Sequence, residues 1–266
     1  MRLNKHVLDE ISKVSEVAGY LWQRQWCERN AGNISLNLTG LITIKKDDLR
    51  INRYVKTNLP AEAAGMTIFV SGTGERLREL VNKPSEVACI IHIDNNAAGY
   101  YIIWGGVNNS TLRPTSEFVS HLGIHLTNAK AENNLRCVLH THPIELIAIS
   151  HHPKLGTDEV ALNKALWSML PEIRVFVPRG IFIAPYEMPG SEELAKLTIE
   201  GLKQRDVILW SKHGALAVGK DAIQAFDYID VANKGALIYL KCLQSGYVPV
   251  GMTDEEMKGL EIFIPR

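Results

Sequence analysis

The sequence has no excess of charge of either sign. Lys and Arg together number 29, and so do Asp and Glu, which gives a formal net charge of zero over 266 residues. A chain without bulk charge is not expected to recognise nucleic acid or a membrane surface electrostatically, although a small anionic ligand needs only local positive potential. Hydrophobic residues at 46% and charged residues at 22% are ordinary for a soluble globular protein.

Paired cysteine motifs and long apolar runs are also missing. The four cysteines (Cys27, Cys89, Cys137 and Cys242) lie far apart and form no C-x-x-C pair, so free thiols in a reducing compartment are the simpler interpretation. The first residues lead into an amphipathic helix rather than a signal peptide, and no stretch approaches the length of a membrane span. We therefore expect a cytoplasmic protein without a membrane partner.

No linker, repeat or low-complexity segment divides the chain, so we expect a single domain over residues 1–266. Short apolar or alternating segments predict strands at residues 34–38, 41–44, 49–55, 67–71, 87–93, 100–104, 137–142, 173–177, 181–184, 207–210 and 216–218. Helical periodicity and capping residues predict helices at residues 5–28, 75–81, 114–130, 158–170 and 221–244, with shorter ones from 144 and 191. The tail beyond residue 246 looks irregular. Strand pairs separated by helices favour an α/β fold with a largely antiparallel, mixed sheet covered by helices on both faces.

The residues that carry chemistry centre on His140 and His142, at the end of an apolar run. Side chains alternate along a strand, so both imidazoles point the same way while Cys137 points away from them. Two imidazoles on one strand face make half of a metal site, and His213, at the end of another apolar run, offers a third ligand. Because H-x-H also occurs by coincidence on half-exposed strands, the surrounding residues must support the metal interpretation.

Two glutamates are candidates for acid or base chemistry. Glu117 lies in the N-terminal turn of a predicted helix, behind a hydroxyl residue in capping position, where the helix dipole favours its ionised form. It could complete a His₃Glu shell or work as a base, and the alternative is an ordinary capping-region acid. Glu172 precedes a predicted strand, where it is a second candidate acid or base or simply a solvated loop acid.

Three small polar turns are candidates for anion binding, because backbone N–H groups at glycine turns and helix N-termini bind anions without net positive charge. Their candidate residues are Asn30, Gly32, Asn33, Thr73, Gly74, Thr115 and Ser116. Each turn alone is weak evidence, since most glycine-rich turns are only turns. His121 and His125 have metal-pair spacing on a helix, but there is no H-E-x-x-H motif, and we interpret them as surface or packing residues.

Taken together, these motifs resemble those of the metal-dependent class II sugar-phosphate aldolases, and the resemblance covers nearly the whole chain. The motifs that carry it are Asn30-x-Gly32-Asn33, Ser71-Gly72-x-Gly74, Pro114-Thr115-Ser116-Glu117, His140-x-His142 and His213-Gly214. Where such enzymes often have a first glycine after the asparagine, this chain has Ala31. The resemblance implies a three-layer α/β/α fold, a homotetramer with active sites at subunit interfaces, and one Zn²⁺ ion per subunit held by His140, His142 and His213.

The resemblance also implies roles for the other candidates. Glu117 would be a displaceable fourth ligand and the acid/base, Glu172 would serve the active site of a neighbouring subunit, and the seven turn residues would face the substrate phosphate. The implied reaction is cleavage of L-rhamnulose 1-phosphate to dihydroxyacetone phosphate and L-lactaldehyde in rhamnose catabolism. Alternatives are related enzymes acting on fuculose 1-phosphate, pentulose phosphates or methylthioribulose phosphate, a noncatalytic interaction domain of the same fold, and a zinc hydrolase.

Overall fold

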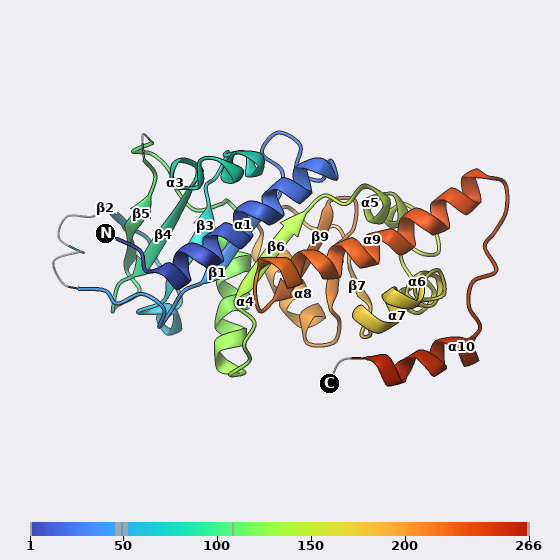
Figure 1. Cartoon of the computed structure of the whole chain (residues 1–266). Helices are drawn as coiled ribbons and strands as arrows, with labels where there is room; N and C mark the ends of the chain where they lie inside the picture. Colours follow the sequence, from blue (N-terminus) through green and yellow to red (C-terminus); the bar gives the residue numbers. More distant parts are fainter. Residues whose placement is uncertain (1, 46–48, 50–52, 108, 265–266) are drawn as a thin grey trace.

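A computed structural model describes residues 2–45, 49, 53–107 and 109–264 (Figure 1). The strands are β1 (Asn33–Asn37), β2 (Arg53–Lys56), β3 (Thr67–Ser71), β4 (Ala88–Ile93), β5 (Gly99–Gly105), β6 (Cys137–Thr141), β7 (Ile181–Ala184), β8 (Val207–Trp210) and β9 (Gly214–Gly219). Within these residues they form one nine-stranded sheet, in the order β2-β5-β4-β3-β1-β6-β9-β8-β7. Only the β7–β8 pair of this sheet is parallel, so the prediction of a largely antiparallel, mixed sheet is confirmed.

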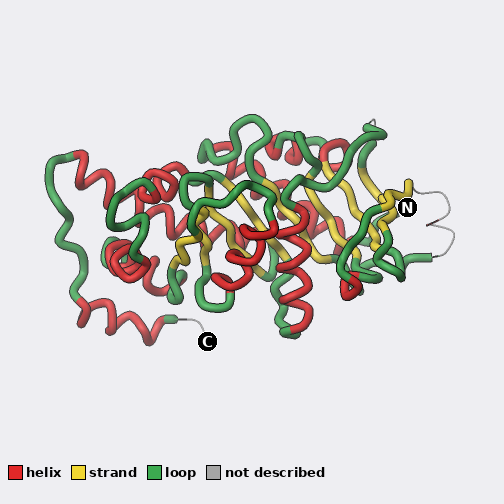
Figure 2. Tube along the Cα trace, turned by 180° about the vertical axis from the view of Figure 1, so that it is seen from behind, coloured by secondary structure: helices red, strands yellow, loops and turns green. Residues whose placement is uncertain are grey.

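Helices cover both faces of the sheet. The α-helices are α1 (Lys5–Gln23), α3 (Pro84–Val87), α4 (Phe118–Lys130), α5 (Ile144–Ser150), α6 (Glu159–Trp167), α7 (Pro171–Phe176), α8 (Glu192–Leu202), α9 (Ala222–Gln244) and α10 (Asp254–Gly259). Short 3₁₀ helices are η1 (Ala61–Ala63), η2 (Leu77–Val81) and η3 (Leu260–Phe263). Figure 1 shows α1 and α9 across the near face, and Figure 2, seen from behind, shows α4 and α8 across the other.

The alternation of side chains along each strand explains these layers. On β6, Leu139 is buried in the core under α1 and α9, while its neighbour Val138 is buried on the opposite side, with Ile124 of α4 and Leu194 of α8. Each face of the sheet is therefore apolar and needs its own layer of helices. The three-layer α/β/α arrangement expected from the resemblance is confirmed.

The segment 173–177, predicted as a strand, instead belongs to helix α7 up to Phe176, and Val177 is the C-cap residue of that helix. Pro171 occupies the first turn, where its fixed φ favours a helix and its missing N–H costs no hydrogen bond. Ile173 and Val177 are both buried, and the N–H of Val177 donates to the carbonyl of Ile173 at 3.0 Å. Burial at i and i+4 is the helical pattern, and this segment was too short for its periodicity to separate helix from strand.

Other boundaries also differ from the prediction. The N-terminal helix ends at Gln23, residues 41–44 form no strand, and the helix predicted at 75–81 is the 3₁₀ helix η2. Of the strand predicted at 49–55, only the end is seen, as β2, since 50–52 lie outside the described residues.

The tail predicted to be irregular contains α10 and η3. A capping box starts α10: Thr253 Oγ1 accepts from the N–H of Glu256, and the Glu256 carboxylate accepts from the N–H of Thr253. Glu261 then pairs with Arg174 of α7 at 2.8 Å, which ties the tail to the body of the protein.

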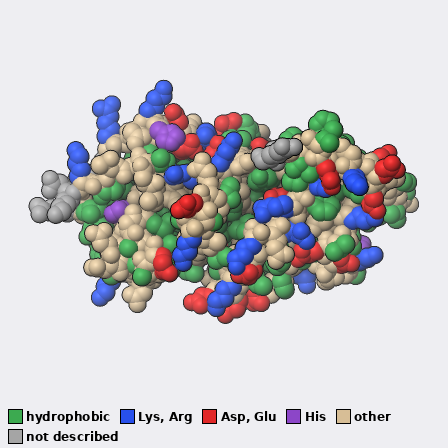
Figure 3. All heavy atoms as spheres, turned by 90° about the horizontal axis from the view of Figure 1, so that it is seen from below, with side chains coloured by type: hydrophobic (Ala, Val, Ile, Leu, Met, Phe, Trp, Pro, Cys, Tyr) green, Lys and Arg blue, Asp and Glu red, His purple; other side chains and the backbone are tan. Residues whose placement is uncertain are grey.

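The charge distribution agrees with the balanced composition. Figure 3 shows basic and acidic side chains intermingled on the face seen from below. Among the helices in the described ranges, none combines the length and the apolar composition needed to cross a membrane.

Candidate active site

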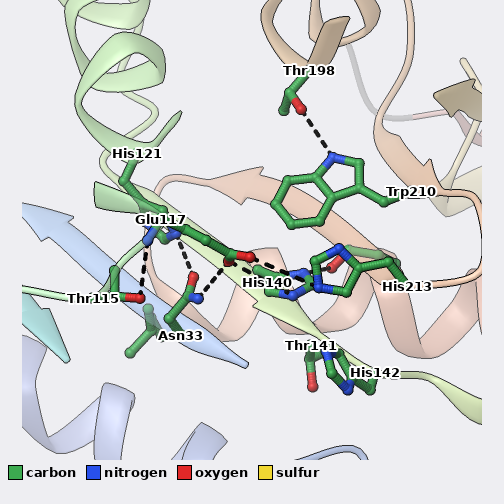
Figure 4. Close-up of polar contacts among 12 residues, drawn as sticks. Asn33, Thr115, Glu117, His121, His140, Thr141, His142, Thr198, Trp210 and His213 are labelled. Carbon is green, nitrogen blue, oxygen red and sulfur yellow. Dashed lines mark hydrogen bonds and ion pairs between the residues drawn. The ribbon is translucent and has the colours of Figure 1, made fainter. Parts of the chain in front are cut away.

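Three histidines from two neighbouring parts of the sheet converge on one point (Figure 4). His140 lies on β6, His142 follows the end of that strand, and His213 lies in the turn between β8 and β9, which pairs with β6. One ring nitrogen of each histidine lies within 4.8 Å of the corresponding nitrogen of the other two. The sequence prediction that these three imidazoles meet is confirmed in geometry, while metal binding by them stays a prediction.

Hydrogen bonds at Nδ1 determine which ring nitrogen of His140 and of His142 keeps a free lone pair. Nδ1–H of His140 donates to the carbonyl of Ala215 at 3.0 Å, and Nδ1–H of His142 donates to the carboxylate of Glu28 at 2.7 Å. A carbonyl or carboxylate partner at Nδ1 leaves the lone pair on Nε2, the arrangement found in metal-ligating histidines. The backbone N–H of His142 also donates to the carbonyl of Trp26, which holds the loop that carries Glu28 against the strand end.

Close packing holds the rings in place. The ring of His140 lies against that of Trp210 with centroids 4.3 Å apart, and Nε1–H of Trp210 donates to Thr198 Oγ1 at 2.9 Å. Gly214 must be glycine here, because a Cβ atom would lie 2.5 Å from the carbonyl oxygen of Thr141 and 2.8 Å from Cε1 of His140. In the His213-Gly214 motif, His213 is a candidate ligand, and Gly214 leaves the space that the rings of His140 and His142 occupy.

His140 and His213 are neutral at neutral pH. Burial lowers the pKa of His140 well below its usual range, and the neighbouring His213 and His142 lower it further. Burial, with a smaller contribution from His142, lowers the pKa of His213 to about 4. Neutral imidazoles keep the lone pairs that a cation needs.

Glu117 lies beside this cluster and is buried. One carboxylate oxygen lies 3.8 Å from Nε2 of His140, and the other lies 3.8 Å from Nε2 of His213. Asn33 donates from Nδ2 to the carboxylate at 2.6 Å. Burial raises the pKa of Glu117, although the hydrogen bond from Asn33 opposes this shift.

The prediction that a hydroxyl residue caps this helix is wrong. Glu117 itself is the N-cap residue of α4 and its side chain makes no capping hydrogen bond, while Thr115 Oγ1 only accepts a 3.4 Å contact from the N–H of Glu117. The carboxylate is therefore free of the helix end and faces the histidines, as the labels in Figure 4 show.

The three polar turns meet around the histidines and line a cavity of about 200 Å³. Its lining contains all the residues predicted for phosphate binding: Asn30, Gly32, Asn33, Thr73, Gly74, Thr115 and Ser116, with Ala31, Gly72, Glu117, His140, His142 and His213. The turns come together because Gly72 forms a bridge with Pro114 and the N–H of Thr115 donates to the carbonyl of Ser71 at 2.9 Å. No lysine or arginine lines this cavity among the described residues.

Glycine is required at one corner of this cavity. Gly32 has φ +75°, and a Cβ atom there would lie 2.9 Å from the carbonyl oxygen of His140. The backbone of the first turn can approach β6 only without a side chain at that position. The Asn33 side chain, in contrast, is already engaged by Glu117 and His121.

Glu172 is not at the site of its own chain. It is exposed in the first turn of α7 and does not line the cavity. The sequence placed it in a loop before a strand, which is wrong, because Pro171 begins a helix there. Its proposed role at a neighbouring subunit stays a prediction.

Several neighbours of the site were not found from the sequence. His121 and His125 are packing residues, but they are fully buried and both contact Ser35 Oγ at 2.7 Å. Glu28 contacts a histidine 114 residues further along the chain, and nothing in local spacing indicates such a pair. Its position directly before the first polar turn was the one available signal.

Comparison with known proteins agrees with this geometry. The model of the class II aldolase and adducin N-terminal domain family matches residues 12–240. A rhamnulose-1-phosphate aldolase of Bacteroides thetaiotaomicron is 43% identical over 256 residues, which cover 95% of this chain and 93% of the relative. A rhamnulose-1-phosphate aldolase of Listeria welshimeri is 31% identical and covers 94% and 90% of the two chains.

Solved structures share the fold. A sugar-phosphate aldolase from Thermotoga maritima superposes with a TM-score of 0.76 at 30% identity, covering 92% of this chain and 100% of its own. An L-fuculose 1-phosphate aldolase superposes with a TM-score of 0.60 at 19% identity, covering 95% and 94%, and supports the fold alone. The chain belongs to the class II aldolase and adducin N-terminal domain family.

Proposed function

We propose that this protein is a zinc-dependent aldolase that cleaves L-rhamnulose 1-phosphate to dihydroxyacetone phosphate and L-lactaldehyde. The observation that carries the proposal is the convergence of His140, His142 and His213 with Glu117 in a cavity lined by three neutral polar turns. The rhamnulose-1-phosphate aldolase that is 43% identical over nearly its full length supports the choice of substrate. Residues 1–266 would act as one domain, in the cytoplasm.

The donor set fits a zinc ion. Three imidazoles whose lone pairs are available, next to one carboxylate, are the nitrogen and oxygen ligands that Zn²⁺ prefers. When bound, such an ion supplies Lewis acidity that polarises the substrate carbonyl and stabilises the charge left by cleavage of a carbon–carbon bond. His140, His142 and His213 would hold it, and Glu117 would be the displaceable fourth ligand.

The polar turns would bind the substrate phosphate through neutral donors. The turns at 30–33 and 73–74, and the residues 115–116 just before α4, line one cavity where free N–H and hydroxyl groups could bind an anion. The N–H groups of Thr73 and Thr115 already donate to backbone carbonyls, so other donors of these turns would be used. Ala31 replaces a glycine common in such enzymes, and its own N–H already donates to the carbonyl of Glu28 at 2.8 Å. Its neighbours would therefore make the phosphate contacts.

Glu117 would carry the proton. Cleavage between C3 and C4 leaves a carbanion at C3, and a carboxyl group whose pKa is raised by burial can deliver a proton to it. The C4 hydroxyl must lose its proton as the bond breaks, so a second group is needed. We assign this to Glu172 of a neighbouring subunit in a homotetramer, because Glu172 is exposed and away from its own cavity.

A retro-aldol assay tests the proposal. Purified protein should release dihydroxyacetone phosphate from L-rhamnulose 1-phosphate, lose this activity with a chelator, and regain it with Zn²⁺. L-fuculose 1-phosphate and L-ribulose 5-phosphate serve as comparison substrates, and faster turnover of either one would overturn the assignment. Glu117→Gln should lower kcat by about 10²-fold or more, the usual contribution of an acid/base group. Glu193→Gln, at an exposed position of α8, is the matched control.

A further inference from the structure

Behind Glu117 a row of polar side chains continues into the core between β1 and α4. Asn33 Oδ1 contacts Nε2 of His121 at 2.5 Å, and Ser35 Oγ contacts Nδ1 of His121 and Nε2 of His125, both at 2.7 Å. Ser35, His121 and His125 are fully buried and Asn33 nearly so. The row begins at the Glu117 carboxylate, with the 2.6 Å bond from Asn33.

The row exists because a helix and a strand present residues at nearly equal spacing. Glu117, the N-cap residue of α4, is followed at intervals of four residues by His121 and His125 within the helix, about 6 Å per step. Asn33 and Ser35 are two residues apart on β1 and face the same side of the sheet, at a step of about 6.8 Å. Each strand residue therefore fits between two helix residues, and the five side chains alternate along one line.

The hydrogen bonds of this row run in one direction. The Asn33 NH₂ group donates to Glu117, so its oxygen must accept, and Nε2–H of His121 is the donor. Burial lowers the pKa of His121 and of His125 to about 3, so both rings are neutral and carry one proton each. Nδ1 of His121 then accepts from the Ser35 hydroxyl, whose oxygen accepts from Nε2–H of His125.

The far end of the row agrees with this direction. Nδ1 of His125 is buried and has no hydrogen-bond partner among the described residues. In the direction derived above it is a bare lone pair. In the opposite direction it would be an N–H without an acceptor, which is the rarer and more costly state of a buried group.

We propose that Ser35, His121 and His125 are positioning residues that act through Asn33 to hold the Glu117 carboxylate at the histidine cluster. The row locks the Asn33 amide with its NH₂ group toward Glu117, because turning the amide would set two acceptors, or two donors, against each other. This inference rests on the proposed function for its kinetic consequence only. Apolar residues could fill the same volume without the cost of burying polar groups, so packing alone does not explain the row.

The first test determines the direction of the hydrogen bonds in the row and needs no activity assay. Solid-state NMR of protein labelled with ¹⁵N-histidine distinguishes a ring protonated at Nε2 from one protonated at Nδ1. Both His121 and His125, assigned from spectra of His121→Gln and His125→Gln, should carry the proton on Nε2. A proton on Nδ1 of either ring would overturn the proposal, whatever the protein turns out to cleave.

The second test compares two buried serines. Ser35→Ala removes the hydroxyl that links the histidines, and we expect kcat for retro-aldol cleavage to fall about tenfold, the size of one buried hydrogen bond, with KM nearly unchanged. Ser120→Ala is the matched control, because Ser120 is also fully buried, lies on α4, and its hydroxyl has no partner among the described residues. The control should keep wild-type kcat, and bound metal should be equal in both variants.

A conservative replacement separates positioning from folding. His125→Gln keeps an N–H donor near the place of Nε2 and should retain most of the activity, whereas His125→Leu should slow kcat as much as Ser35→Ala does. Equal kcat in Ser35→Ala and wild type, or equal losses in the two serine variants, would overturn the proposal. If the wild-type protein cleaves no ketose phosphate, the proposed function fails, and the NMR result still decides the direction of the row.

Discussion

At the residue scale, the orientation of each imidazole decides what the site can bind. The carboxylate of Glu28 fixes the ring of His142 from an exposed loop, whereas a backbone carbonyl fixes His140 inside the sheet. The Glu28 contact can therefore be removed without disturbing a strand. Removing this contact tests how much the orientation of the His142 ring contributes to metal affinity.

We expect Glu28→Ala to weaken Zn²⁺ binding about ten- to a hundredfold, because His142 would lose the partner that holds its tautomer and ring plane. Competition between the protein and a fluorescent zinc chelator measures this change directly. Glu193→Ala, at an exposed site on α8, should bind Zn²⁺ as the wild type does. Equal affinities in the two variants would show that Glu28 does not orient His142.

At the scale of the element, the buried histidines make α4 sensitive to acid. The folded-state pKa of His121 and of His125 is about 3, against 6.5 for an unperturbed histidine. Below pH 6.5 the unfolded chain takes up protons at both rings and the folded chain does not, so the free energy of unfolding falls as pH falls. Each ring contributes a slope of about 1.4 kcal/mol per pH unit in that window.

His125→Gln should therefore flatten this dependence by about 1.4 kcal/mol per pH unit between about pH 6 and pH 5. Urea denaturation at one protein concentration, followed by tryptophan fluorescence, gives the free energies. His6→Gln is the control, since His6 is exposed on α1 and is hydrated in both states. An unchanged slope in the His125 variant would mean that this ring is protonated inside the folded protein.

Elements with strong periodicity could be predicted, and those defined by one turn could not. Residues 34–38 alternate between apolar and polar side chains, and the structure has strand β1 there, at Asn33–Asn37. Residues 173–177 make little more than one helical turn, which is too short to show a period, and only the position of Pro171 favoured a helix. The capping box of Thr253 and Glu256 was visible in the sequence, but without an apolar run behind it the signal was weak.

The site shows the same limit. Histidines at strand ends and glycine-rich turns can be recognised as candidate site residues from their residue type alone, and they meet as expected. The contacts that orient them join residues far apart in the chain, such as Asn33 with Glu117, which are 84 positions apart. Such pairs depend on strand order and register, which one sequence does not reveal.

At the scale of the whole molecule, the position of Glu172 requires a second chain if this residue takes part in the reaction. Mixed tetramers test this: Glu117→Ala and Glu172→Ala subunits, unfolded together and refolded, should regain a substantial fraction of the activity that each lacks alone. Some interfaces would then combine an intact Glu117 with an intact Glu172 from the neighbouring subunit.

A negative result is equally informative. If Glu172 served its own chain, no interface between the two variants would hold both residues, and activity would stay at the level of the separate mutants. Native mass spectrometry of one isotope-labelled variant establishes that the subunits have mixed. Mixed tetramers without recovered activity would exclude the composite site.

The spacing of α4 and β1 has a further consequence. A step of four residues on a helix and a step of two on a strand differ by about 0.8 Å, so the two spacings stay in register only over a short length. Here the register extends over the three positions 117, 121 and 125. At the next position α4 has Ala129, and on β1 Asn37 instead accepts from the N–H of Thr39. Inserting one residue in either element would therefore abolish the polar row and not merely shift it, since no neighbouring register would realign the side chains of α4 with those of β1.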